Sequence, residues 1–184
     1  MIGIAINAVI LLRVNPEVIS ERAEVREETK GWDRVVTSAA LVFVVTMFVV
    51  AGLDWRSGWS PAVPLWIWLA ALVVLILGSA FSSWAMISNA YFATTVSIQE
   101  DRGHTVVTGG PYQFVRHPAY SGWMLSTLAT PLVLGSLWAY IPAGLVVISF
   151  VVRAALEDKT LLAELDGYET YVGGVHYRLL PGVW

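Results

Sequence analysis

The sequence of 184 residues contains no cysteine and few charged residues, and these two shortages exclude several classes of protein. Without cysteine there is no disulfide framework and no thiolate metal site. The three histidines, His104, His117 and His176, lack the spacing of a metal-binding motif, so no metal site is expected. Charged residues make up 14% of the chain, whereas a soluble domain carries roughly 25%. Hydrophobic residues make up 57%, so the composition predicts a polytopic membrane protein.

Motifs of the common nucleotide-binding and hydrolytic folds are also absent. The chain has no GxGxxG after a strand, no P-loop, no GxSxG and no HExxH. Because no alternation of strands and helices occurs, a nucleotide-like ligand would have to bind without a Rossmann domain. No nucleic-acid partner is expected.

Long apolar segments dominate what is present. Four of them carry at most one charged residue each and are able to enter a bilayer: residues 35–53, 64–87, 120–137 and 139–156. At about 1.5 Å per residue, such helices approach the roughly 30 Å thickness of the hydrocarbon core. Gly135 and Ser136 predict a tight turn that makes a helical hairpin of the last two. The predicted fold is all-α, a polytopic integral membrane bundle with about four full spans.

The N-terminal part of the chain is less regular. Residues 1–12 are apolar, but they make only about 18 Å of helix, too short to span unaided. A shortened first helix, a partial insertion and a start codon placed too late all remain open. The segment has no basic n-region and no small-residue cleavage site, so no cleavable signal peptide is expected. Residues 15–33 alternate acids and bases, which predicts a short interfacial helix or simply a solvated charged face.

Basic residues are distributed very unequally between the two predicted sides of the membrane. If the spans alternate, ten of the eleven lysines and arginines fall on one side, and only Arg56 falls on the other. The positive-inside rule then places residues 13–34, 89–119 and the C-terminal tail in the cytoplasm. We therefore expect an integral protein of the inner, cytoplasmic membrane whose polar residues share the cytoplasmic face.

Residues 109–120, GGPYQFVRHPAY, form the most unusual polar segment of this apolar chain. The Gly-Gly-Pro turn and the His-Pro step interrupt helix continuity and leave backbone donors able to meet a ligand. Titratable residues beside a membrane bundle are costly, which favours a site. The alternative is a helix start at which Arg116 and His117 face lipid headgroups, with Tyr112 and Tyr120 as interface anchors.

Arg153 and Glu157 form a second candidate near the cytoplasmic end of the last apolar helix. Four residues apart, they share one helix face, and a simple ion pair would account for them. Arg153, however, lies in an otherwise apolar helix, which predicts that it faces the bundle interior. A guanidinium there is suited to holding a substrate carboxylate, and Glu157 is suited to accepting hydrogen bonds from a ligand amine.

Taken together, these pieces resemble the isoprenylcysteine carboxyl methyltransferase family of membrane enzymes, including its bacterial members. The matching elements are residues 89–92 (NAYF), 98–112 (IQEDRGHTVVTGGPY), 116–123 (RHPAYSGW), the Arg153 and Glu157 pair, and 177–184 (YRLLPGVW). The resemblance covers residues 15–184. The RHPxY element is shared with phospholipid methyltransferases, whereas the upstream run and the Arg-xxx-Glu pair narrow the match.

The resemblance implies a methyl transfer that depends on S-adenosylmethionine, bound in a non-Rossmann site at the cytoplasmic helix ends. It implies that Arg153 binds the methyl-accepting substrate and that Arg153 and Glu157 are the catalytic pair. The positions that match the family's cofactor-contacting motif are Gln99, His104, Thr105, Val106, Val107, Tyr112, His117, Pro118, Ala119, Tyr120 and Glu157. The chain is read as one domain, 1–184, comprising a cofactor loop (89–120), the helical hairpin (120–156) and a cytoplasmic tail (157–184).

The expected acceptor is a lipophilic or lipid-modified carboxylic acid of the isoprenylcysteine type, reached from the membrane lipid. Such a carboxylate, with a pKa of about 3.5, is ionised at neutral pH and needs a cation rather than a general base. A phospholipid amine would have to lose a proton first, and Arg153 would repel its charge. Phospholipid N-methylation and a non-catalytic ligand-binding membrane protein remain the alternatives. The sequence does not indicate an oligomeric state.

Overall fold

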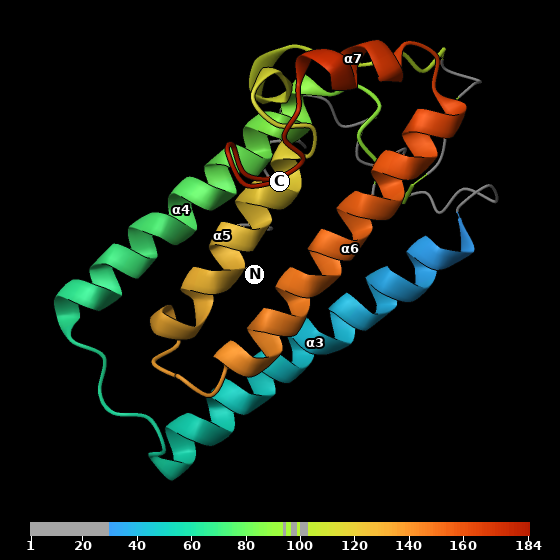
Figure 1. Cartoon of the computed structure of the whole chain (residues 1–184). Coiled ribbons are helices and arrows are strands. Elements are labelled where there is room, and N and C mark those ends of the chain that lie inside the picture. Colours follow the sequence, from blue (N-terminus) through green and yellow to red (C-terminus); the bar gives the residue numbers. More distant parts are fainter. Residues whose placement is uncertain (1–29, 94, 97–98, 100–102) are drawn as a thin grey trace.

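A computed structural model describes residues 30–93, 95–96, 99 and 103–184, and within these ranges every regular element is a helix (Figure 1). The elements in chain order are α3 (Gly31–Ser57), α4 (Leu65–Ser88), the short 3-10 helix η2 (Gly110–Gln113), α5 (Pro118–Val133), α6 (Tyr140–Glu164) and α7 (Tyr168–Gly174). The all-α prediction is confirmed for this part of the chain. The predictions for residues 1–12 and 15–29 lie outside the described residues.

Among the described helices, three are long and apolar enough to cross a membrane: α3, α4 and α6, with 27, 24 and 25 residues. Their large apolar side chains point outward, and Leu41, Leu77 and Ile148 are each more than half exposed. An apolar exterior of this kind is stable in lipid rather than in water. The fourth predicted span, 120–137, corresponds to α5, which has 16 residues. At about 24 Å, α5 is shorter than the hydrocarbon core of a typical bilayer.

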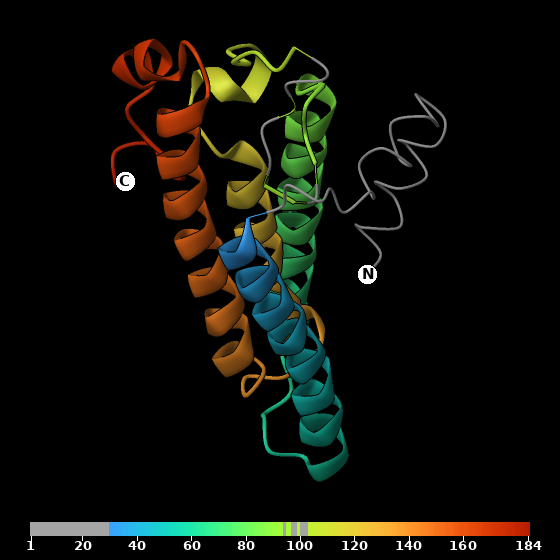
Figure 2. The ribbon, with the colours of Figure 1, turned by 90° about the vertical axis from the view of Figure 1, so that its right-hand side faces the viewer.

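Small residues hold the helices together. α4 packs along α5, α5 packs against α6, and α6 packs against α3. α3 and α4, although consecutive in the chain, therefore lie at opposite edges of the bundle in Figure 1, and Figure 2 shows α3 in front of the other three helices. At the closest approach of α4 and α5, the Ser82 hydroxyl donates to the Ala119 carbonyl at 3.1 Å. A Cβ atom on Gly122 would come within 2.5 Å of the Gly78 carbonyl oxygen. The two backbones can touch only because both positions are glycine, a packing typical of membrane helices.

A polar cluster closes the end of the bundle at the C-terminus of α3. Asp54, which is 1% exposed, accepts hydrogen bonds from the backbone N–H and the hydroxyl of Ser60 and from the hydroxyl of Ser136. Gly135 has φ of 72°, a left-handed conformation that suits glycine and lets the chain reverse between α5 and α6. The predicted hairpin with its Gly-Ser turn is therefore confirmed.

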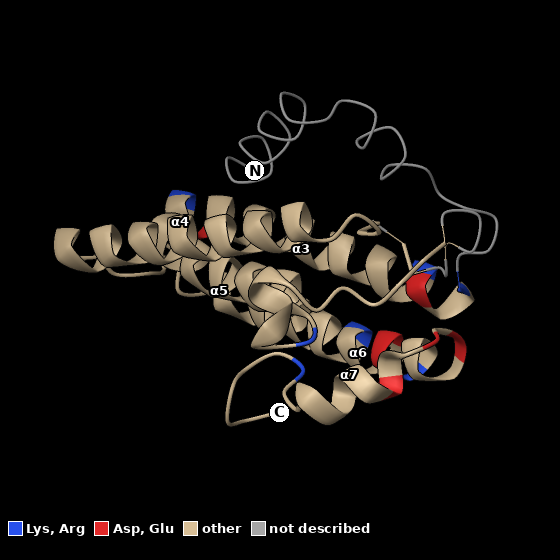
Figure 3. Ribbon diagram, turned by 90° about the horizontal axis from the view of Figure 1, so that it is seen from above, with Lys and Arg blue, Asp and Glu red and all other residues tan. Residues whose placement is uncertain are grey.

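Apart from Asp54 and Arg56 near the C-terminus of α3, the described charged residues lie at the opposite end of the bundle, and Figure 3 shows them gathered around α6, α7 and the start of α3. α6 is longer than its apolar run predicts, since it ends at Glu164 rather than at residue 156. The chain stays helical after its composition turns polar, so Glu157 and Asp158 lie on a helix rather than in a tail. α7 and residues 175–184 then fold back over this end of the bundle.

Candidate functional site

A cavity lies at the charged end of the bundle. Its walls are formed by residues 89–93, 95–96 and 104–107, by η2, by the start of α5, by the last turns of α6 and by α7. The cavity is open to solvent on one side, and both polar and apolar side chains line it.

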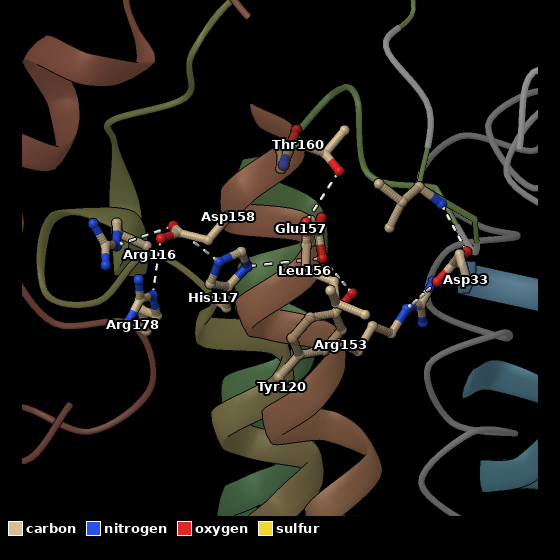
Figure 4. A network of polar contacts seen from close by, with 12 residues as sticks. Asp33, Arg116, His117, Tyr120, Arg153, Leu156, Glu157, Asp158, Thr160 and Arg178 are labelled. Atoms are coloured by element: carbon tan, nitrogen blue, oxygen red, sulfur yellow. Dashed lines mark hydrogen bonds and ion pairs between the residues drawn. The ribbon is translucent and has the colours of Figure 1, made fainter. Parts of the chain in front are cut away.

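The start of α5 places two aromatic side chains beside one carboxylate of α6. Pro118 occupies the first position of α5, where its missing N–H and fixed φ favour helix initiation, and His117 precedes it as the N-cap. His117 and Tyr120 stack with their ring centroids 5.7 Å apart. The Tyr120 hydroxyl donates to Glu157 Oε2 at 2.6 Å, and His117 Nδ1 lies 3.8 Å from the same oxygen (Figure 4). Glu157 thus presents an oriented carboxylate to the cavity.

Asp158, the next residue on α6, joins four segments that surround the cavity. It is 1% exposed and receives hydrogen bonds from the Tyr168 hydroxyl at 2.8 Å and from Arg178 Nε at 2.9 Å (Figure 4). Arg116 Nε lies 3.2 Å and His117 Nε2 3.5 Å from its Oδ1. Burial first, and then the Asp158 carboxylate, raise the pKa of Tyr168, so that this phenol keeps its proton and remains a donor.

The C-terminal segment completes the wall around the Arg-His pair. The backbone N–H groups of Arg116 and His117 donate to the carbonyls of Tyr177 and Arg178, both at 2.9 Å. The Ser121 hydroxyl donates to the Leu179 carbonyl at 2.6 Å. A segment about sixty residues further along the chain thus holds residues 116–118, the RHP element, in place.

α7 is tied to the turn that contains η2. The Tyr171 hydroxyl donates to the Tyr112 carbonyl at 2.6 Å, and burial raises the pKa of Tyr171, which keeps that hydroxyl protonated. Both tyrosines line the cavity. The sequence analysis did not single out Tyr171, and this contact ties it to the cavity wall.

Described residues between Asn89 and Val107 form the remaining wall. The Tyr91 and His104 rings lie with their centroids 4.6 Å apart, and both side chains line the cavity. Buried Gln99 donates from Nε2 to the Tyr91 carbonyl at 2.7 Å, which supports the wall from behind. The Thr105 hydroxyl lies 3.4 Å from the Tyr91 hydroxyl.

Arg153 lies one turn before Glu157 on α6 and is 8% exposed, which confirms that it faces the bundle interior. Its Nε and Nη2 donate to the two carboxylate oxygens of Asp33 on α3, at 2.7 and 3.2 Å. Its guanidinium carbon lies 5.5 Å from the centroid of the Tyr120 ring. The ion pair that the structure gives to Arg153 is therefore with Asp33, a residue that the sequence analysis did not single out.

Most of the predicted cofactor positions converge on this one cavity. Nine of the eleven line it: His104, Thr105, Val106, Val107, Tyr112, His117, Ala119, Tyr120 and Glu157. Gln99 and Pro118 are buried outside the lining: Gln99 donates to the Tyr91 carbonyl, and Pro118 begins α5. Among the lining residues, the sequence analysis did not assign Tyr91, Arg116, Tyr168 and Tyr171 to the site. The sequence signal for Tyr91 was its place in the NAYF element.

The chemistry of this set is that of an organic-ligand site. The lining combines aromatic rings, apolar side chains and one half-buried carboxylate, Glu157. Within the described ranges, no group of three or more histidine, aspartate or glutamate residues is arranged to hold a metal ion. Such a site can bind a planar heterocycle against its aromatic faces and a hydroxyl or amine at its carboxylate.

Comparison with known proteins matches this chain to one family. A model of the isoprenylcysteine carboxyl methyltransferase family matches residues 70–163, just over half of the chain. A protein-S-isoprenylcysteine O-methyltransferase of Schizosaccharomyces pombe is 31% identical over 105 residues, which cover 55% of this chain and 44% of that protein. Protein-S-isoprenylcysteine O-methyltransferase B of Arabidopsis thaliana is 33% identical over 103 residues, covering 55% and 52%.

The protein-S-isoprenylcysteine O-methyltransferase of Homo sapiens is 27% identical over 105 residues, which cover 56% of this chain and 37% of the human protein. The chain thus spans about half the length, or less, of these relatives. The family match includes α5 and nearly all of α6, and with them His117, Tyr120, Arg153 and Glu157. The family resemblance and the membrane-spanning helices agree, and the chain belongs to the isoprenylcysteine carboxyl methyltransferase family.

Proposed function

We propose that this protein is a membrane methyltransferase that transfers a methyl group from S-adenosylmethionine to the carboxylate of a lipophilic, isoprenylcysteine-like acceptor. The observation that carries the proposal is the position of Tyr120 between two ionic groups. Its hydroxyl binds the cavity carboxylate Glu157, and its ring lies 5.5 Å from the Arg153 guanidinium. A ligand in the cavity and an acceptor at Arg153 would therefore meet across a single tyrosine.

The cavity residues fit S-adenosylmethionine. The aromatic side chains offer faces for an adenine ring, and Val106 and Val107 offer an apolar edge. The Glu157 carboxylate, oriented by Tyr120, suits the ribose hydroxyls or the amine of the ligand. When bound, S-adenosylmethionine supplies an electrophilic methyl group carried on a sulfonium.

The role of the chain's own residues is then to bind, align and exclude water. The aromatic and apolar walls shield part of the cavity from bulk solvent, and Arg153 provides hydrogen-bond donors for the acceptor carboxylate. No general base is needed, because a carboxylate is already ionised at neutral pH. Because Asp33 pairs with Arg153, the two side chains together carry no net charge. Selection of an acid over an amine would therefore depend on donor geometry more than on charge.

We also propose that the site faces the cytoplasm and that the acceptor enters from the lipid. The unequal distribution of basic residues supports this orientation, since the end that carries the cavity is also the end rich in lysine and arginine. The relatives are named for protein-S-isoprenylcysteine, which supports a lipid-modified acceptor. The Arg153 donors would meet the free carboxyl group of such an acceptor.

The test uses the purified full chain in lipid nanodiscs with methyl-labelled S-adenosylmethionine. N-acetyl-S-farnesylcysteine is expected to gain a base-labile methyl ester, whereas its carboxamide and phosphatidylethanolamine are expected to gain no label. Exclusive labelling of the phosphatidylethanolamine amine would overturn the carboxylate assignment, and no binding of S-adenosylmethionine would overturn the enzyme itself.

Two variants separate the ligand roles. Glu157→Gln should weaken S-adenosylhomocysteine binding by about 10- to 100-fold, the value of one charge-assisted hydrogen bond. Arg153→Ala should lower kcat/KM for the acceptor by a similar factor while the dissociation constant of S-adenosylhomocysteine changes by less than about threefold. Equal losses in both measurements for Arg153→Ala would contradict its role at the acceptor.

A further inference from the structure

Asp33, near the N-terminus of α3, is an unusual residue for a membrane-facing helix. Its side chain is fully buried, at 0% exposure, and its two oxygens accept from Arg153 Nε at 2.7 Å and Nη2 at 3.2 Å. A fork of two nearly parallel hydrogen bonds fixes the plane of a guanidinium as well as its position. Arg153 of α6 is thereby held in one orientation by a residue of α3, the helix that packs against α6 (Figure 4).

The same carboxylate also reaches the cavity wall. Asp33 Oδ2 accepts a hydrogen bond from the backbone N–H of Val96 at 2.9 Å, and Val96 lines the cavity. The Lys30 backbone N–H approaches the Val96 carbonyl at 3.4 Å, a second link between the start of α3 and this strip of chain. Asp33 of α3 therefore contacts both Val96 in the cavity wall and Arg153 of α6.

Joining the helices does not by itself require this buried pair, because Met47 and Ala51 of α3 also pack against Ala143 of α6. Lys30 Nζ adds a weaker, partly exposed contact to both carboxylate oxygens of Glu164, at 2.8 and 2.9 Å. A buried ion pair is an expensive way to stabilise a fold, because apolar residues of equal size serve as well or better. The buried Asp33 carboxylate is better explained by its effect on the orientation of the Arg153 guanidinium.

We infer that Asp33 is a positioning residue for the acceptor carboxylate, which it serves by fixing the orientation of Arg153 relative to the cofactor cavity. The inference rests on the proposed function, in which Arg153 binds the acceptor. Asp33 itself touches neither cofactor nor acceptor. It also lowers the net attraction of Arg153 for anions, so its effect on alignment and its effect on binding act in opposite directions.

These opposite effects give the inference a distinctive kinetic signature. Asp33→Asn keeps the size of the side chain but removes its charge and half of the fork. The guanidinium then attracts an anionic acceptor at least as well, so KM should stay within about threefold of wild type or fall. Misalignment by as little as 1 Å can cost on the order of 100-fold in rate, so kcat should fall by at least about tenfold. A loss that arises only from loosened structure would also raise the dissociation constant of S-adenosylhomocysteine.

The matched control is Asp54→Asn, which alters the other buried carboxylate of α3. Asp54 is 1% exposed and hydrogen-bonded, but it lies at the opposite end of the helix from the cavity. Its substitution should lower thermal stability while leaving kcat within about threefold of wild type. A double variant provides the second control, since Asp33→Asn should cost nothing further in kcat when Arg153 is already Gln.

The experiment measures kcat and KM for N-acetyl-S-farnesylcysteine, together with S-adenosylhomocysteine binding, in nanodiscs. The inference is overturned if Asp33→Asn keeps kcat within threefold of wild type, or if it lowers kcat equally in the Arg153→Gln background. If Asp33→Asn does not yield folded protein, Asp33→Glu takes its place, with lower kcat at unchanged KM expected and wild-type kcat contradicting the inference. A wild-type protein that methylates no acid acceptor refutes the proposed function instead, and this inference falls with it.

Discussion

Replacing Asp158 with asparagine is the sharpest test of how this site is held together. The substitution preserves shape and one acceptor oxygen, but it removes the negative charge to which Tyr168 and Arg178 donate and which Arg116 and His117 approach. Tyr168 and Arg178 lose a charged partner at 2.8 and 2.9 Å, and Arg116 loses the carboxylate at 3.2 Å. Since the Arg116 side chain is only 5% exposed, water cannot replace the lost partner.

The size of the effect follows from these contacts. A hydrogen bond to a charged group contributes about 1.5–3 kcal/mol, and leaving one member of a buried ion pair without its partner costs about 3–5 kcal/mol. These contributions overlap because they share one carboxylate, so they do not add. We expect Asp158→Asn to lower the free energy of unfolding by about 3–5 kcal/mol. The RHP element should loosen with it, and S-adenosylhomocysteine binding should weaken by at least about tenfold, as for the loss of one charged hydrogen bond.

The assay combines unfolding of the protein in mixed micelles with calorimetric titration of S-adenosylhomocysteine. Glu169→Gln is the control, because Glu169 is an exposed acid in the first turn of α7, and its loss should change stability by no more than about 0.5 kcal/mol. If Asp158→Asn matches this control in both measurements, the carboxylate does not organise the site and the reasoning is refuted.

Two further predictions concern the bundle itself. Gly122→Ala should destabilise the protein by about 1–3 kcal/mol, because the new Cβ would overlap Ser82 and the Gly78 carbonyl. Gly144→Ala on α6, where nothing lies within 4 Å of the new Cβ, should be neutral or slightly stabilising, and a comparison of the two unfolding midpoints checks both. Lys30→Ala should cost no more than about 1 kcal/mol by the same measurement, since its ion pair is partly exposed; a larger loss would mean that this pair holds α3 in place.

Much of the fold could be predicted from the sequence because its signals are local. Length and hydrophobicity identify α3, α4 and α6, and a Gly-Ser pair identifies the turn of the α5–α6 hairpin. The end of α6 was placed eight residues early because hydrophobicity stops where the helix leaves the apolar region, whereas helical hydrogen bonding continues to Glu164. α5 was placed as a full span because its apolar run continues through the turn after Val133.

The site was predicted less completely, for a different reason. Elements matching a known family lie at separate places in the chain, and nine of the eleven expected positions line one cavity. Asp33 and Asp158 were not assigned, because each stands in a charged stretch where an acid is ordinary. Their importance comes from partners such as Arg153, 120 residues away, and Arg178, 20 residues away, and such pairings leave no periodic signal.

The sequence by itself therefore determined that this is an all-helical chain with membrane-spanning segments, which helices are consecutive, and which family motifs it carries. These properties depend on composition and spacing, which are written along the chain. Only the tertiary structure decided that α3 packs on α6, that Asp33 orients Arg153, and that Asp158 holds the RHP element against α7 and the tail. Those contacts depend on which side chains meet after burial, when a carboxylate shut away from water must take its partners from whatever helices pack around it.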